Sequence, residues 1–287
     1  MTQVAPPPEP ARLLAVDLCY PEPPAIDARA LAMLVRSNLP GTALVWSGPS
    51  NLVLRHDRAD PDTSGRLDPA EILGLPPEER PLTAHSPDGH LVHAVWLRVE
   101  PTPAEQRDLS QSWSWPDAHA AFSRCRHQLT VLQLLGGKRK VGERVGAFRG
   151  ALHGLITLAR PLATWWPGSQ QALPPGALVA HPLSGLVNVR LFRSVNDPNV
   201  TITDTLGMYA LGLPDLQCRS RGLPAERLGD LLFELAEYLF RHGNVFRDGR
   251  PVPGLAADQH FVPAPGSSTV PPHRAVIDLD PGQRYAG

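Results

Sequence analysis

The sequence predicts an α+β fold built from two similar halves, each a split βαβ (ferredoxin-like) unit whose sheet is covered by helices. Three observations support this class. Strand-like and helix-like segments alternate along the chain, as expected for sheets covered by helices. Apolar residues make up 42% of the 287 residues, enough for a sizeable core. Short motifs also recur: Ala-x-x-Trp-x-Gly at 43–48 returns at 163–168, and AHSPDGHLV at 84–92 returns as AHPLSGLV at 180–187.

The polar, proline-bearing stretch 57–80 separates the two motifs in the first half. Removing it brings the halves into register, which indicates an internal duplication with 57–80 as an excursion. The alternative is coincidence in a chain biased toward Ala, Leu and Pro. If the duplication holds, the strand at 13–20 is equivalent to that at 127–135, the helix at 27–39 to that at 143–160, and Trp46 to Trp166.

The first half spans 12–104 and follows a proline-rich tail, 1–11, that we expect to be disordered. LLAVDLCY (13–20) is an apolar run typical of a buried strand, and 26–39 has the apolar spacing of an amphipathic helix. Further strands are predicted at 42–46, 51–56 and 90–100.

The second half spans 105–287. Its clearest helix is 224–242, which opens at Pro224 and is followed by Gly243. Arg-Asp-Gly-Arg at 247–250 resembles a type I′ turn and predicts a hairpin. The remaining predicted elements are helices at 115–125 and 143–160 and strands at 127–135, 162–166, 186–195, 207–218 and 275–280.

Composition argues against several function classes. The net charge is −1 and only 19% of residues are charged, so no global field would attract nucleic acid or an anionic membrane. The three cysteines lack metal-binding spacing, which favours reduced thiols in a cytosol. No apolar stretch reaches the length of a membrane span, and the N-terminus lacks a leader pattern. We therefore expect a cytoplasmic protein without membrane association.

Several motifs resemble a bacterial family known as domain of unknown function 4261. They are a Trp-Pro-led helix and strand (112–135), TWWPG (164–168), TLGMYALGLPDLQC (205–218) and GNVFRDGRPVPG (243–254). The resemblance covers about 112–280 and implies a fold more than an activity. The sequence departs from the family pattern in two places: Gln217 replaces the second acid of a Glu-x-Glu pair, and Arg250-Pro251 follows Asp248-Gly249.

The candidate sites are few, and no catalytic residue is assigned. Asp204, Asp215 and Asp248 could in principle converge as oxygen ligands of a metal, although Asp215 and Asp248 also suit turns. The basic loop at Lys138, Arg139 and Lys140 precedes a helix and could hold an anion, with a solvated turn as the alternative. A structural role is the interpretation we favour for Gly207, Gly212, Pro214, Trp166 and Gly249.

Two further features have structural interpretations. Cys125 lies between Arg124 and Arg126, yet a buried structural thiol is favoured over a reactive one. Gly142, Gly146, Gly150 and Gly154 form a stripe every four residues, for which we expect close packing on the chain's own sheet, or otherwise a partner or homodimer contact.

The leading hypothesis is a non-enzymatic, cytosolic protein-interaction or accessory module that needs no cofactor. Its partner would be another protein or a second copy of the chain. The alternatives are an enzyme with a pocket between the halves, and an anion or nucleotide binder acting through 136–144.

Overall fold

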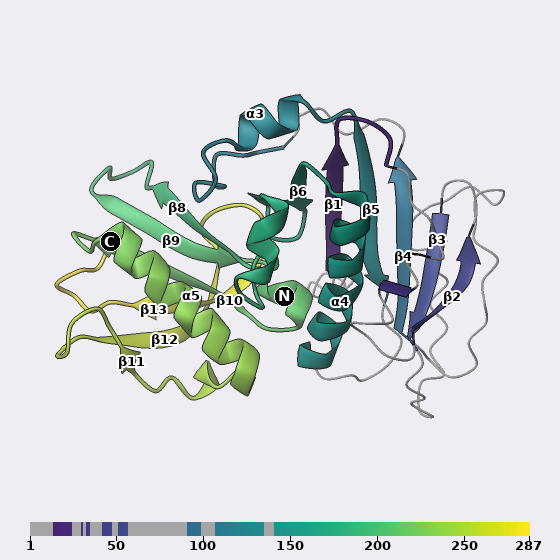
Figure 1. Cartoon of the computed structure of the whole chain (residues 1–287). Helices are drawn as coiled ribbons and strands as arrows, with labels where there is room; N and C mark the ends of the chain where they lie inside the picture. The colour runs from purple at the N-terminus through teal and green to yellow at the C-terminus, as the bar shows by residue number, and fades with distance from the viewer. Residues whose placement is uncertain are drawn as a thin grey trace, which may run out of the picture.

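The computed structural model describes residues 14–24, 30, 33–34, 42–47, 51–56, 91–98, 107–134 and 141–287, and the statements below concern these residues. The predicted α+β class is confirmed. Two sheets stand side by side, and helices α4 and α5 lie on the side that faces the viewer in Figure 1.

The first sheet has seven strands in the order β2-β3-β4-β5-β1-β6-β7, all antiparallel. The apolar runs of β1 and β5 pair at its centre, where Val16 lies opposite Val131 and both are fully buried. The strands are β1 (Leu14–Tyr20), β2 (Thr42–Ser47), β3 (Asn51–His56), β4 (Leu91–Arg98), β5 (His127–Leu134), β6 (Ala163–Trp166) and β7 (Gln171–Leu173).

Helices cover both faces of this sheet around β1. Helix α4 (Val141–Ala159) buries Val145, Phe148 and Leu152 in the main core, as the sequence predicts. Helix α3 (Ala118–Ser123) packs Phe122 with Cys19 in a smaller cluster. Because side chains alternate along a strand, Leu18 and Tyr20 of β1 belong to the main core, whereas Cys19 between them faces α3.

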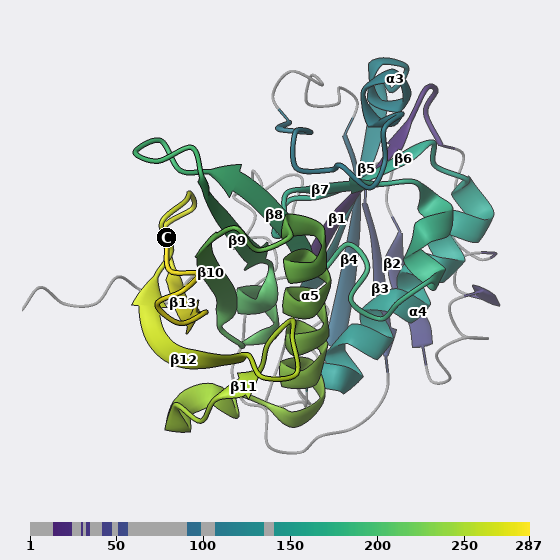
Figure 2. The same cartoon turned by 90° about the vertical axis from the view of Figure 1, so that its left-hand side faces the viewer.

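The second sheet has six strands in the order β11-β12-β13-β10-β9-β8. Strands β10 and β13 run parallel, and a crossover through α5 (Ala225–His242), β11 and β12 joins them (Figure 2). Helix α5 has a strongly amphipathic sequence and buries Leu228, Leu232 and Leu239. The strands are β8 (Asn188–Arg193), β9 (Val200–Leu206), β10 (Asp215–Arg221), β11 (Val252–Pro253), β12 (His260–Ser267) and β13 (Ala275–Asp280).

The two sheets share one hydrophobic core. It joins Leu18 and Trp166 of the first sheet to Leu216 and Leu279 of the second, with side chains of α4 and α5 between them. Trp166 is buried and meets Phe148 edge-on, with ring centroids 6.1 Å apart.

The strand order does not reproduce the predicted halves. The strands expected to be equivalent, 13–20 and 127–135, pair with each other in one sheet. Trp46 lies on the edge strand β2, whereas Trp166 lies on β6 between β1 and β7, so the predicted equivalence of the tryptophans is wrong. The change of sheet falls between β7 and β8, away from the predicted division at 104/105. The tail 1–11 and the excursion 57–80 lie outside the described residues.

Most predicted elements are found within a few residues, and the differences lie mainly around the C-terminal sheet, where β9 was also not predicted. The helix predicted at 26–39 lies largely outside the described residues. The strand predicted at 207–218 is instead the 3-10 helix η4 (Met208–Leu211) followed by β10. The turn at 247–250 does not join two strands, because η5 (Phe246–Asp248) ends there at Gly249, whose φ is 67°. Strand β12 was missed because it contains Pro263 and Pro265, which usually argue against a strand.

Glycine is required where β9 meets η4. Gly207 has a φ of 123°, and a Cβ atom there would lie 2.0 Å from the carbonyl oxygen of Leu186. Gly212 ends η4 in the left-handed conformation, with a φ of 77°, and Pro214 leads into β10. The motif therefore forms a compact connection between two paired strands.

The glycine stripe of α4 does not form the continuous contact with the sheet that the sequence led us to expect. A Cβ atom added at Gly142 or Gly146 would meet no atom within 4 Å among the described residues. Gly150 is half-buried and Gly154 is buried, so only the later part of the stripe turns inward.

The described residues include no helix long and apolar enough to cross a membrane.

We expect Gly207→Ala to lower the free energy of unfolding by about 2–4 kcal/mol, since it combines an unfavourable φ with a clash against backbone. Gly222 is a matched control: its φ is 74°, but a Cβ atom there meets nothing within 4 Å among the described residues. Gly222→Ala should cost only about 1 kcal/mol. Urea unfolding measures both variants, and equal losses would contradict the role assigned to the Leu186 contact.

Gly146→Ala should instead stabilise the protein by about 0.5–1 kcal/mol, because it replaces an exposed glycine within a helix and has free space around it. Thermal unfolding tests this expectation. A decrease in the melting temperature would instead support the close packing that the sequence predicts at this position.

Candidate functional site

Four charged side chains meet inside the second sheet. Arg190 comes from β8, Asp204 from β9 and Asp215 from the start of β10, while Arg274 directly precedes β13. We call these four residues the buried charged cluster. The strand order places them together, because β13, β10, β9 and β8 are successive neighbours and Arg190 lies directly opposite Asp204.

Asp204 is fully buried, and its carboxylate accepts hydrogen bonds from both arginines. Arg190 binds it through two nitrogens, Nε to Oδ1 at 3.0 Å and Nη2 to Oδ2 at 2.6 Å. Arg274 Nη2 donates to the same Oδ2 at 2.8 Å. This two-pronged geometry suits a planar guanidinium and a carboxylate, and it fixes the orientation of Arg190.

Asp215 is the second buried acid and has different donors. Arg274 Nε donates to its Oδ2 at 2.8 Å, whereas Oδ1 accepts from the Thr205 hydroxyl at 3.1 Å and the Met208 backbone N–H at 3.0 Å. The Thr205 hydroxyl in turn accepts the N–H of Leu216 at 2.8 Å. Asp215 therefore ties β9, η4 and β10 together.

The segment after β12 closes the cluster from outside. Pro271 presents its carbonyl oxygen to Arg190 Nη1 at 2.8 Å, and Pro272 presents its own to Arg274 Nη1 at 2.8 Å. Ser268 accepts the backbone N–H of Arg274 at 3.0 Å. Arg190 Nη1 also donates to Gln170 Oε1 at 3.3 Å, so main-chain and amide oxygens accept hydrogen bonds from the arginines beside the carboxylates.

Burial and charge act against each other in this cluster. Burial raises the pKa of Asp215, while Arg274 and the hydrogen bonds from Met208 and Thr205 oppose that increase. Burial also disfavours the charged form of Arg274, but Asp215 and Asp204 outweigh it, so the pKa of Arg274 is raised. Two acids and two arginines leave the cluster neutral.

The cluster is built for mutual pairing rather than for metal binding. The described residues contain no group of three or more His, Cys, Asp or Glu side chains able to hold a metal ion. The three aspartates that could in principle have served as metal ligands do not form such a group. Asp204 and Asp215 do meet through Arg274, but Asp248 lies apart in an exposed turn, where it pairs with Arg250 at 3.0 Å.

Sequence reasoning missed both arginines of the cluster. The chain has 27 Lys and Arg residues with Lys138 and Lys140 as the only lysines, so arginine carried little weight as a signal. One clue was present in the strand pattern, because Arg190 is the one charged residue in the run 186–192, which apart from Asn188 is otherwise apolar. A charge in a buried strand requires a partner.

The other sequence-predicted candidates lie elsewhere. Lys138, Arg139 and Lys140 lie outside the described residues, so the anion hypothesis stays a prediction. Gly207, Gly212 and Pro214 form the connection beside Asp215, Trp166 lies in the main core, and Gly249 ends η5.

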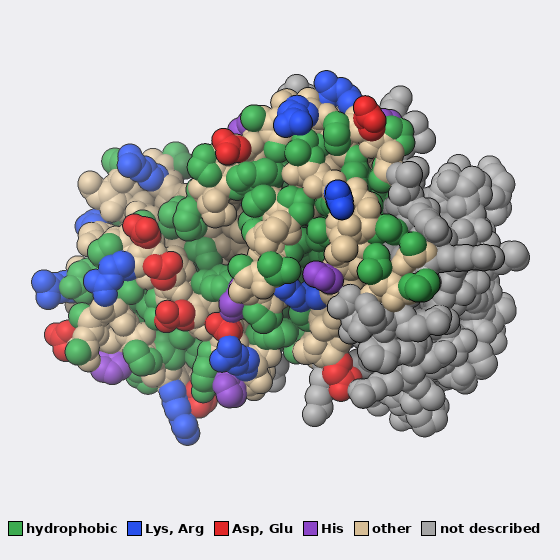
Figure 3. All heavy atoms as spheres, in the orientation of Figure 1, with side chains coloured by type: hydrophobic (Ala, Val, Ile, Leu, Met, Phe, Trp, Pro, Cys, Tyr) green, Lys and Arg blue, Asp and Glu red, His purple; other side chains and the backbone are tan. Residues whose placement is uncertain are grey.

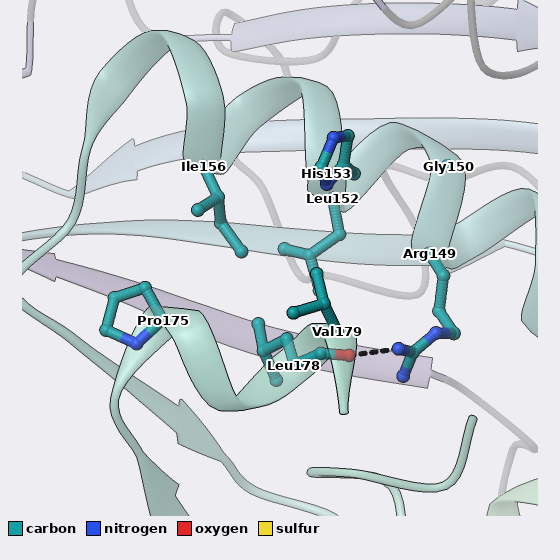
Figure 4. A pocket seen from close by; sticks show the side chains of 8 residues that line it. All are labelled: Arg149, Gly150, Leu152, His153, Ile156, Pro175, Leu178 and Val179. Atoms are coloured by element: carbon teal, nitrogen blue, oxygen red, sulfur yellow. Dashed lines mark hydrogen bonds between the residues drawn. The ribbon is translucent and has the colours of Figure 1, made fainter. Parts of the chain in front are cut away.

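A groove of about 290 Å³ lies between α4 and the 3-10 helix η3 (Pro175–Val179). Figure 4 shows Leu152 and Ile156 directed from α4 toward η3, which contributes Leu178 and Val179. Its remaining lining residues are Arg149, Gly150, His153 and Pro175. The groove is therefore mainly apolar, with Arg149 and His153 as the polar side chains of its lining.

Arg274→Met should lower the free energy of unfolding by about 3–5 kcal/mol, since it leaves Asp215 buried without its cationic partner. Adding Asp215→Asn should recover part of that loss, because the buried charge is removed. Arg250→Met provides the control: its pair with Asp248 is exposed and should contribute less than about 1 kcal/mol. Urea unfolding gives all three values, and equal losses for Arg274→Met and Arg250→Met would contradict the pairing described here.

Comparison with known proteins gives one result for this region. No curated protein and no solved structure matches the chain significantly. Three members of the buried charged cluster, Asp204, Asp215 and Arg274, lie within the segment that does match a family model. Residues 204–280 match the model described as "Domain of unknown function (DUF4261)", the family that the sequence motifs resemble.

Proposed function

We propose that this protein is a non-enzymatic interaction module that binds a short segment of a partner protein in the groove between α4 and η3. The partner segment would place one or two apolar side chains in the groove and an acidic group beside them. The observation that supports this proposal is the combination of a mainly apolar lining with a cation, Arg149, for which the described residues provide no acidic partner.

The apolar part of the groove is open to solvent. Val179 is 71% exposed at its edge, although it follows the buried Leu178. Hydrophobic side chains also gather over the middle of the face that carries α4 and α5 (Figure 3). Covering such side chains contributes about 25 cal/mol per Å² of apolar surface removed from water.

Arg149 supplies the charge complementarity. Its guanidinium donates to the carbonyl oxygens of Leu178 and of Pro182, the latter at 3.1 Å, and burial lowers its pKa. Within the described part of the chain, no carboxylate pairs with it. A carboxylate of a bound segment would offset the cost of partly burying this cation.

The size of the groove also favours a peptide side chain over a larger ligand. Sites for small molecules and cofactors usually enclose about 300–1,000 Å³, and this groove lies at the lower limit. The buried charged cluster is less suited to binding a partner, because its acids and arginines already pair with one another. The three free cysteines fit the cytosolic location that we propose with it.

Selection from a displayed random-peptide library tests the proposal. We expect the wild-type protein to enrich peptides that combine apolar and acidic residues. Val179→Asp should reduce the affinity of those peptides at least about tenfold, since it buries a carboxylate in an apolar contact. Val195→Asp is the matched control, because Val195 is 98% exposed in the turn between β8 and β9. Peptides that bind wild type and Val179→Asp equally well would contradict the proposal.

A further inference from the structure

Two cysteines that are distant in the sequence share one small core cluster. Cys19 lies near the end of β1 and Cys125 lies between α3 and β5. Both belong to the cluster that α3 forms on the sheet, together with Phe122. Cys19 is fully buried, whereas Cys125 retains 5% exposure.

Backbone hydrogen bonds hold the two segments against each other. Arg126 N–H donates to the carbonyl oxygen of Tyr20 at 2.8 Å, one residue beyond each cysteine, and Leu162 N–H donates to that of Cys19 at 2.8 Å. The two thiols lie close enough for each to shift the pKa of the other, while Cys125 Sγ donates to the carbonyl oxygen of Ala121 at 3.4 Å and Cys19 Sγ to that of Asp17 at 3.8 Å. A bond between the sulfurs would therefore join segments that are already in contact.

The two thiols differ in chemical character. The interaction with the Cys19 thiol lowers the pKa of Cys125, and Arg107, Arg124 and Arg126 add to that effect while burial opposes it. The same interaction and burial raise the pKa of Cys19. Arg107 is itself buried, held by Gln128 Oε1 at 2.7 Å and placed over the Phe122 ring at 5.0 Å.

We propose that Cys125 and Cys19 form a peroxide-oxidised dithiol, in which Cys125 reacts first and Cys19 resolves it to a disulfide. The shared cluster, the backbone hydrogen bonds around it and the buried Arg107 provide the geometry. A thiol of lowered pKa next to a resolving cysteine is the arrangement of redox-sensing sites, and Cys125 is the more exposed of these two cysteines.

The reaction balances with hydrogen peroxide as the oxidant. The Cys125 thiolate attacks one peroxide oxygen, the O–O bond breaks, and hydroxide leaves, so that sulfur is oxidised to the sulfenic acid while peroxide is reduced by two electrons. The Cys19 sulfur then attacks Cys125 Sγ, forming the S–S bond and breaking the S–O bond. The thiol protons convert the two departing hydroxides to water.

The test uses the full chain, reduced and then exposed to hydrogen peroxide. Alkylation after denaturation, read by intact mass and peptide mapping, should find three free thiols before treatment and one afterwards. The remaining thiol should be Cys218, which is fully buried and whose pKa is raised to about 12 by burial and by Asp278 and Asp280. A thiol reductant should restore all three.

Single variants separate the roles. Cys19→Ala should stop at a Cys125 sulfenic acid that dimedone captures, Cys125→Ala should leave Cys19 reduced, and Cys218→Ala should oxidise like wild type. Thermal unfolding checks that each variant is folded. The proposal is overturned if the folded protein keeps three thiols under conditions that oxidise the urea-unfolded chain, if Cys218 is lost as fast as Cys125, or if the disulfide joins two chains.

Discussion

The ion pairs of Arg274 are the interaction on which the second sheet depends. Strand β13 runs parallel to β10, and the chain reaches it only after the long crossover through α5 and β12. Arg274 precedes β13 directly and binds Asp215 at the first residue of β10 as well as Asp204 on β9. A slip of β13 along β10 would move this cation away from both acids. Because an unpaired buried charge costs several kcal/mol, the cluster favours the observed register.

Close backbone contacts fix how this sheet meets the rest of the molecule. Gly185 has a φ of 79°, and a Cβ atom there would lie 2.1 Å from Cε2 of Trp166, so the chain crosses directly over the indole. Gly207 makes a similarly close approach to the carbonyl oxygen of Leu186. These contacts bring the connection into β8, the motif after β9 and the buried face of the first sheet into one packed region. Both positions require glycine, because a Cβ atom would overlap a neighbouring atom.

The features that suggest function lie away from the segment that matches the family model. Residues 204–280 contain three of the four clustered charges and most of the second sheet. The groove between α4 and η3 and the Cys19–Cys125 pair both lie outside those residues, on elements that pack against the first sheet. The matched segment thus corresponds to a structural unit stabilised by buried charge. The proposed partner binding and oxidation chemistry belong to the part of the chain that precedes it.

Local sequence determined the elements, and the tertiary structure decided their assembly. The periodicities of 13–20, 127–135 and 224–242 each placed a strand or helix correctly, because these patterns reflect one buried face and depend little on distant residues. The same patterns carry no information on strand order. The recurring motifs suggested that 13–20 and 127–135 belong to separate halves, but as β1 and β5 they pair in one sheet. The sequence identified the two acids of the buried charged cluster, Asp204 and Asp215, as candidates. It did not identify their arginine partners, which are separated from them by up to 70 residues. Only the packing of β8, β9, β10 and β13 brings those charges together, because a buried ion pair is selected by proximity in space and leaves no fixed spacing in the chain.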